Sequence, residues 1–505
     1  MTDETHEGGG WRWGWILLLG AVALFVLLFG GHWLWTAGSA KQLARHVALI
    51  KSSGEPIEPA DFRVAPVPDA DNAAIDIRAA VRSVDTASEA WKAYDRLSPR
   101  LPLTEKEIAA LRALVADNAA AFASIDAAMT RKGIDWQINL KSPVIAVLLP
   151  DLNGQRMLAN VVAARAMLAY TDGDHAAALA DVRRLRFLSR ALETQPMIVS
   201  HLVSNGVDAM AVAAVARMTP GLKIDSGKGD VPPQQVAELI AALLDDAPQR
   251  RGLKRALQSE RMAQLDTARC VADGTLSLAS LSAGGIGGGG GAPGGGAAVI
   301  NFAVRPIALA DGALMIDHTS KVIRAAEAAL DAPTFVQSAP PVPPQIMSAP
   351  FRHVLARIML PSFERAIQTD FRVMTERRLA AVALALRWYA IDHGGKLPEK
   401  LEDLVPKYLP TVPADPMQAG GKLLKYVPNP AKPILYSVGD NAVDDGGSEA
   451  SATNRPAHGI WQQLDAVRPL TPQPREIFPG EEDEEAEAPA TAPATASPAA
   501  ADPVD

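Results

Sequence analysis

The chain has 505 residues, of which 48% are hydrophobic and 5% aromatic, and its formal net charge at pH 7 is -8. This length exceeds one ordinary hydrophobic core and predicts two or three domains, while the dominance of alanine and leucine is typical of packed helices. Much of the negative charge lies in one run, Glu481 to Glu487, so the remainder carries no basic surface for nucleic acid. Cys270 is the single cysteine, which excludes an intramolecular disulfide and a multi-cysteine metal site.

A short N-terminal segment, residues 1–10, precedes an unbroken apolar run from Trp13 to Gly31. At about 1.5 Å per residue, this run is long enough to cross a bilayer core, which takes roughly 20 residues. Indole rings favour the headgroup region, and tryptophans bracket the run on both sides. They are Trp11, Trp13 and Trp15 on one side, and Trp33 and Trp35 on the other. The pattern predicts a transmembrane anchor over residues 11–36, with membrane lipid as its partner.

A cleaved signal peptide is the alternative for this segment. The small residues from Thr36 to Ala40 would suit a cleavage site, but a signal peptide has a shorter apolar region. The charge count places Arg12 before the run and Lys41, Arg45 and Lys51 after it, which favours a cytoplasmic body. The C-terminal module described below favours the opposite side. We predict a single-pass protein of the bacterial cell membrane with an extracytoplasmic body, and the charge count conflicts with that side.

A helical domain is expected over residues 37–275. A short amphipathic helix at Ala40–Ser52 is followed by one at Asn72–Leu97, and Thr104 with Glu107 forms a capping box that opens a helix to about Met129. Further helices are expected near 153–170, 176–192, 198–218, 233–244 and 253–271. The two helices around Gly173 resemble one tetratricopeptide-type hairpin. Because no fixed-period repeat follows, an ordinary pair of packed helices is the favoured interpretation.

The rest of the chain divides by composition. The segments are a Gly-rich linker or loop at 276–299, a helix and Pro-rich spacer at 300–350, a long helix with a small α+β module at 351–470, and a disordered acidic Pro/Ala/Glu tail at 471–505. The glycine run lacks the Lys-Ser/Thr that a phosphate-binding loop requires. The long helix is expected to end at Gly394 and Gly395, because glycine adopts the left-handed conformation that closes helices.

Strands are expected in this module at Leu423–Val427 and Pro433–Val438, and a cluster of carboxylates follows the second. Asp440, Asp444 and Asp445, together with Asn441, lie among glycines, and oxygen ligands of this kind suit calcium. The loop is not an EF-hand, because the twelfth position counted from Asp440 is Ser451. The same residues also favour an ordinary solvated turn without metal. On residue types alone both interpretations stay open, and the predicted ligands are Asp440, Asp444 and Asp445.

The module also resembles the C-terminal part of the major pseudopilin of type II secretion systems. The motifs that carry the resemblance are Asp392–Pro398, Asp415-Pro416, Leu424–Tyr426, Tyr436–Gly439 and a late strand-like Ile460-Trp461. The resemblance implies structural calcium on the three aspartates. Met1 to Phe29 lacks the basic leader and the glutamate in the apolar helix that a pseudopilin needs, so a pseudopilus subunit is not expected. The whole chain looks more like uncharacterised bacterial membrane-anchored proteins that carry this module behind a helical domain.

No catalytic motif is visible. The chain lacks a Gly-x-Ser-x-Gly elbow, and none of its nine histidines forms a His-x-x-x-His pair. His201 is expected to be a surface or structurally satisfied histidine, and its neighbour Ser200 is not evidence for a nucleophile and base. We therefore predict a mostly α-helical, non-enzymatic envelope protein that binds or scaffolds an envelope partner. The alternatives are a component of a type II secretion-like machine, or an envelope enzyme whose site is assembled from distant helices.

Overall fold

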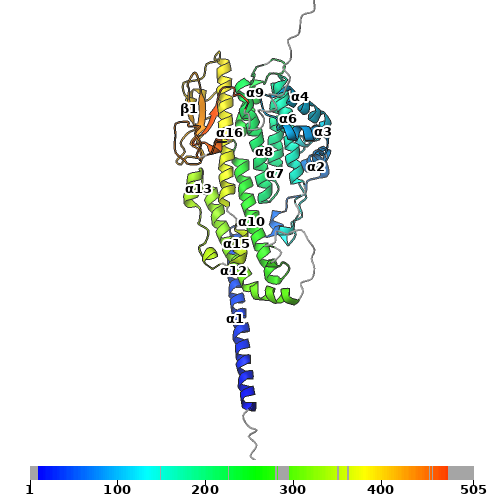
Figure 1. Cartoon of the computed structure of the whole chain (residues 1–505), viewed down its shortest axis with the longest axis vertical. Helices are drawn as coiled ribbons and strands as arrows, with labels where there is room; N and C mark the ends of the chain where they lie inside the picture. The colour runs from blue at the N-terminus through cyan, green and yellow to red at the C-terminus, as the bar shows by residue number, and fades with distance from the viewer. Residues whose placement is uncertain are drawn as a thin grey trace, which may run out of the picture.

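The computed structural model describes residues 10–475 except 148, 150, 226, 279–280, 282–294, 350–351, 361–362, 454 and 458, with side chains at 10–12 and 295–299 also left aside. The predictions made for the N-terminal residues 1–9, for most of the Gly-rich segment and for the tail beyond 475 lie outside these residues. The described chain is mostly helical, as predicted. Its helices build an elongated body, with one long helix projecting from one end and a small sheet near the other (Figure 1).

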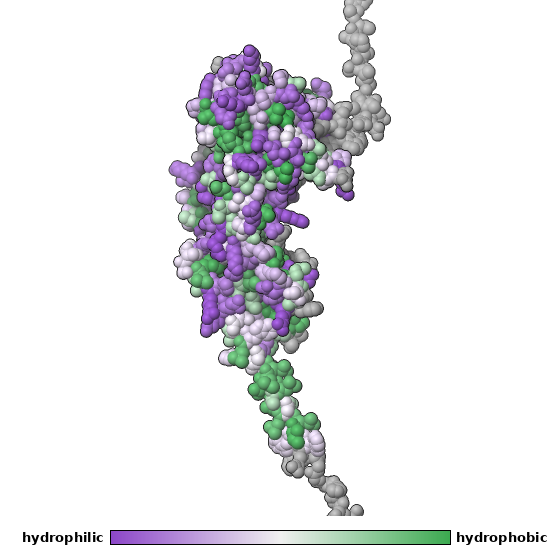
Figure 2. Space-filling view, turned by 90° about the vertical axis from the view of Figure 1, so that its left-hand side faces the viewer, coloured by the Kyte–Doolittle hydropathy of each residue, from purple (hydrophilic) through white to green (hydrophobic). Residues whose placement is uncertain are grey.

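The projecting helix is α1, Gly10–Ser52. The predicted anchor and the separately predicted helix at Ala40–Ser52 are therefore one continuous helix, since no proline interrupts the chain between them. Its first half is apolar and uncovered, and Figure 2 shows this half as a hydrophobic stalk below a largely polar body. Its last turns are different, because Leu43, Val47 and Ile50 are buried against the body. The helix is long and apolar enough to span a membrane.

The first part of the body is a helical bundle. Its helices are α2 (Ala73–Ser83), α3 (Glu89–Leu97), α4 (Glu105–Asp117), α5 (Ala119–Met129), α6 (Leu152–Thr171), α7 (His175–Glu193), α8 (Ile198–Met218) and α9 (Pro233–Leu244), with short 3-10 turns at Pro59–Phe62, Asp69–Asp71, Val144–Ala146 and Thr219–Gly221. The predicted capping box is confirmed, with the Thr104 hydroxyl accepting from the Glu107 amide. Two predicted helices are each split in two. Ser88 caps the start of α3, and α4 and α5 meet at Asn118 with a bend of 62°.

By length and composition alone, the segment Ile198–Gly221, which contains α8, could also cross a membrane. The bent pair α4–α5 could do so if the two helices formed a single broken span. Half of the apolar window of α8 is buried inside the body. The same helix buries polar side chains, among them His201, Asn205 and Asp208. A helix that buries polar groups among other helices is a core element of this bundle.

The second part of the body contains α10 (Ala247–Asp273), α12 (Gly295–Ala328), α13 (Ala332–Ser338), α14 (Gln345–Ser348), α15 (Val354–Met359) and α16 (Phe363–Asp392). Helices α10 and α12 are antiparallel, since Lys254 contacts Glu327 at one end and Gly274 approaches Asn301 at the other. The predicted Pro-rich spacer includes α13, which accepts Pro333 in its first turn, where no intrahelical amide is needed.

The sheet has three antiparallel strands in the order β1-β2-β3. They are β1 (Lys425–Val427), β2 (Ile434–Ser437) and β3 (Ala466–Pro469). The first two agree with the predicted strands, but the late strand expected at Ile460-Trp461 is wrong. Ile460–Gln462 is a 3-10 turn, and the third strand lies further on, where Ala466 and Val467 are buried. The largest hydrophobic cluster extends from Ala73 in α2 to Leu435 in β2, so the bundle and the module share one core.

Candidate functional site

The three aspartates predicted to bind calcium lie on the loop after β2, and each is engaged separately. One carboxylate oxygen of Asp440 accepts a hydrogen bond from Arg372 Nε at 3.0 Å, and the other contacts the same guanidinium. Asp444 lies 3.3 Å from Lys425 Nζ. Two of the three negative charges are therefore balanced by neighbouring cations from α16 and β1.

Asp445 accepts a hydrogen bond from Asn441 Nδ2 at 2.8 Å. Among the residues that the structure describes, no three His, Cys, Asp or Glu side chains form a group that could hold a metal ion. Joint coordination by the three aspartates would require Arg372 to release Asp440 and Lys425 to release Asp444. Calcium binding by this loop stays a prediction.

A fourth aspartate, Asp465, holds the loop in the present arrangement. Its fully buried carboxylate accepts hydrogen bonds from the backbone amides of Asp445 at 3.3 Å, Gly447 at 2.8 Å and Ser448 at 2.9 Å. A carboxylate that accepts several amide hydrogen bonds fixes a turn in much the way that an ion would. Sequence reasoning missed this residue, although an aspartate directly before the apolar pair Ala466-Val467 was a usable signal.

A second buried carboxylate, that of Asp415, ties the segment before β1 to the end of β2, where the aspartate loop begins. It accepts hydrogen bonds from Ser437 Oγ at 2.7 Å and from the amides of Val438 at 2.9 Å and Met417 at 3.0 Å. Burial is the largest influence and raises the pKa of Asp415, while these hydrogen bonds oppose it. The Asp-Pro motif that contributed to the resemblance thus has a structural role.

A buried polar site lies between α8 and α16. The His201 Nε2 atom is 2.7 Å from an Asp370 carboxylate oxygen, which also accepts a hydrogen bond from Asn205 Nδ2 at 2.8 Å. His201 is 1% exposed. Of the two outcomes expected for it, a surface or a structurally satisfied histidine, the structure shows a buried histidine engaged by Asp370. Burial lowers the pKa of His201, but the charge of Asp370 and its hydrogen bond outweigh burial and raise that pKa overall.

The other ring nitrogen of His201, Nδ1, is buried and has no hydrogen-bond partner. A Cβ added at Gly252 of α10 would lie 3.3 Å from this nitrogen and 3.4 Å from the carboxyl carbon of Glu193. Glycine at position 252 therefore lets the two titratable groups face the same small space. Burial, the largest influence, raises the pKa of Glu193 to about 7, and the charge of His201 opposes it.

An ionic network continues from this site along α16. Arg186 Nη1 lies 2.9 Å from Asp208, and Arg377 contacts both Asp208 and Asp246. Arg378 also contacts Asp246. Because an unpaired charge inside a protein is costly, these contacts fix how α7, α8, α10 and α16 pack together.

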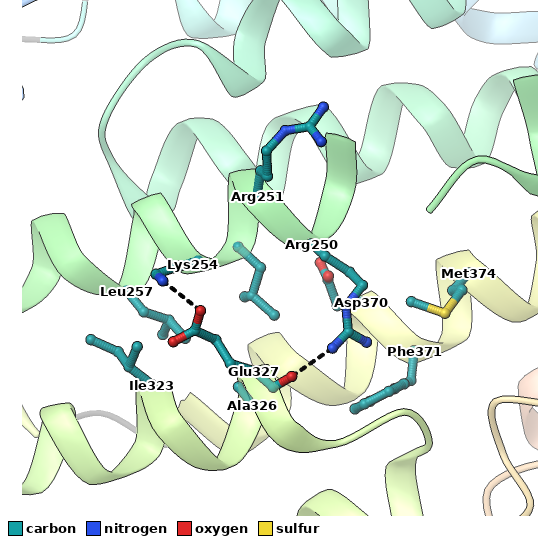
Figure 3. A pocket seen from close by; sticks show the side chains of 11 residues that line it. Arg250, Arg251, Lys254, Leu257, Ile323, Ala326, Glu327, Asp370, Phe371 and Met374 are labelled. Carbon is teal, nitrogen blue, oxygen red and sulfur yellow. Dashed lines mark hydrogen bonds and ion pairs between the residues drawn. The ribbon is translucent and has the colours of Figure 1, made fainter. Parts of the chain in front are cut away.

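A pocket of about 170 Å³ adjoins the buried pair, and Figure 3 shows the side chains that line it. Its rim carries Arg250, Lys254 and Glu327, with Lys254 Nζ 2.5 Å from the Glu327 carboxylate. Asp370 lines this pocket as well as holding His201. Asp370 is thus shared by the pocket and the buried pair, and His201 is not among the residues that line the pocket.

The chain was compared with protein-family models, curated proteins and solved structures. No protein family, curated protein or solved structure matches the chain.

The buried group can hold a proton. His201 with Asp370 forms an ion pair when the imidazole is protonated, and Glu193 titrates near neutral pH beside it. None of these residues was predicted as a site. Asp370 is separated from His201 by 169 residues, so no linear motif could have paired them.

Proposed function

We propose that this chain is a membrane-anchored envelope protein whose helical body binds or scaffolds another envelope component. The observation that carries the proposal is the character of α1. One continuous helix presents an uncovered apolar half and then a half in which Leu43, Val47 and Ile50 are buried in the body. Such a helix would have a lower free energy in lipid than in water, because its exposed apolar surface would leave the solvent.

The anchoring is tested by a charge placed within the proposed span. Leu24 is 58% exposed and Leu49, on the same helix but beyond the apolar run, is 66% exposed. An arginine at the centre of a transmembrane helix costs about 2.5–3.5 kcal/mol on insertion, so Leu24→Arg should release the protein from membranes on carbonate washing. Leu49→Arg should leave it in the pellet. Equal pelleting of both variants would contradict the anchor.

The side of the membrane is a separate part of the proposal. We place the body outside the cytoplasm, on the basis of the module resemblance and against the charge count. Protease added to intact spheroplasts should digest the body, and digestion only after lysis would reverse the assignment.

A role in a type II secretion-like machine is a weaker proposal, because it depends on the sequence motifs alone. It requires the protein to copurify with secretion components after gentle solubilisation. A calcium-stabilised loop belongs to the same proposal, with Asp440, Asp444 and Asp445 as its ligands.

One observation favours an enzyme as the second candidate. His201 and Asp370 form a histidine–carboxylate pair next to a pocket, an arrangement used for general acid–base chemistry. The enclosure of His201 favours a structural role for it instead, since a substrate in the pocket would meet Asp370 first. His201→Gln would then impair folding, whereas loss of a measurable activity in a folded His201→Gln protein would favour the enzyme.

A further inference from the structure

The beginning of α12 lies beside α1 at the level where α1 leaves the body. The Phe302 ring stacks on His32 with ring centroids 4.1 Å apart, and it lies 5.7 Å from the Phe29 ring. Further along, His46 lies 3.7 Å from Asp317, so the two helices run in the same direction. The first turns of α12 therefore lie at the base of the body, next to the end of the proposed span (Figure 1).

A hydrogen bond from a side chain of α1 to the backbone of α12 joins the two helices at this level. Pro306 lies inside α12 and has no amide hydrogen, so the Phe302 carbonyl lacks the usual donor four residues later. The Nε2 atom of His32 lies 2.8 Å from that carbonyl oxygen and replaces the missing donor. A protein donor for a freed carbonyl is what a water-poor location requires, because lipid offers no hydrogen bonds.

The surface around this contact is apolar and uncharged. Ile300 is 59% exposed and Phe302 is 46% exposed. The sequence from Gly274 to Val304 contains no Asp, Glu, Lys, Arg or His, and the first charge after it is the exposed Arg305. We call the exposed side chains of Phe29, Trp33, Ile300 and Phe302 the basal patch. It continues the apolar surface of α1 onto a second helix.

We propose that the basal patch is a second membrane contact, in which the start of α12 inserts into the lipid monolayer where the α1 span ends. The proposal rests on the proposed anchoring by α1. Lipid is the chosen occupant because the patch is continuous with the surface of the span and because its stretch of α12 has no charge. Arg305, which follows the patch, is placed to meet lipid headgroups, as cationic side chains do at the ends of membrane segments.

The test measures the depth of single residues in the full-length protein reconstituted in phosphatidylcholine vesicles. Cys270 is replaced by serine, and one new cysteine is introduced at Leu27, Ile300 or Val336 and labelled with the environment-sensitive dye NBD. Val336 is 72% exposed on α13, away from the base of the body, and serves as the exposed control (Figure 1). Lipids with a nitroxide on the acyl chain then quench any dye that lies in the bilayer.

We expect blue-shifted and quenched emission from the dyes at positions 27 and 300, and unquenched emission from the dye at position 336. Quenching at Leu27 without quenching at Ile300 would overturn the basal contact and leave the anchor intact. Quenching at neither would refute the anchor itself. A blue shift at Ile300 that depends on protein concentration and not on the nitroxide lipid would assign the patch to a second copy, and would also overturn the proposal.

Discussion

The half-buried carboxyl of Glu193 should make the stability of the body depend on pH. Burial raises its pKa from the ordinary value of 4.5 to about 7. The folded chain therefore holds this proton more tightly than the unfolded chain does. The stabilisation by the protonated carboxyl is complete below pH 4.5 and is lost as the pH rises through 7. At about 1.4 kcal/mol per pH unit, the whole interval corresponds to roughly 3 kcal/mol.

Glu193→Gln removes this titration and keeps the shape of the side chain. The variant should gain stability relative to the wild type as the pH rises from 4 to 8, by roughly 3 kcal/mol over the whole range. The raised pKa of His201 also stabilises the fold at low pH, and this stabilisation is lost as the pH rises above that pKa. Both proteins should show this second loss of stability. Glu399→Gln, at an exposed turn, serves as the control and should follow the wild-type curve.

The assay is urea unfolding of the detergent-solubilised protein at several pH values, followed by tryptophan fluorescence. The buried Trp91 and Trp136 report on the bundle that contains Glu193. A difference between Glu193→Gln and the wild type that stays constant across the pH range would refute the reasoning, because the carboxyl would then titrate alike in the folded and unfolded chains.

Three further predictions concern packing and the loop. Asp465→Ala should cost about 2–4 kcal/mol in unfolding experiments, because it leaves three partly buried amides without their acceptor, whereas Asp445→Ala should cost less than about 1 kcal/mol. Added calcium should raise the melting temperature of the wild type and not that of Asp445→Ala if the loop binds the ion, and no rise in either would end the calcium hypothesis. Gly312→Ala should destabilise by about 1–3 kcal/mol, because its Cβ would lie 2.8 Å from that of Ala268. Gly206→Ala, with no atom within 4 Å of its added Cβ, should not destabilise.

Local signals in the sequence predicted much of the helical structure. The boundaries of α8 and α9 agree with the prediction, and the capping box at Thr104 does so as well. Each signal of this kind lies within a few residues of the helix end that it determines. The break within the predicted helix Asn72–Leu97 was not predicted, because the apolar period continues across it and because Ser88 was not recognised as a helix cap.

The candidate site could not be predicted in the same way. His201 and Asp370 meet only because α8 and α16 pack side by side, and neither helix carries a mark of the other in its own sequence. The calcium prediction considered the loop residues alone and did not include Arg372 and Lys425, which come from α16 and β1. Charges that lie close in sequence were visible, and their partners from distant elements were not.

The continuity of α1 would determine how a membrane-anchored body is oriented. A flexible tether would let the body tumble above the membrane, but the helix does not break between the apolar run and the buried residues Leu43 and Val47. The close approach of Gly312 to Leu43 and the His32 contact with Phe302 attach α12 to the same helix at two levels. The tilt of the span would therefore be transmitted to the body. A binding surface on this protein would face its partner at a fixed height and orientation, which favours a scaffold over a freely diffusing domain.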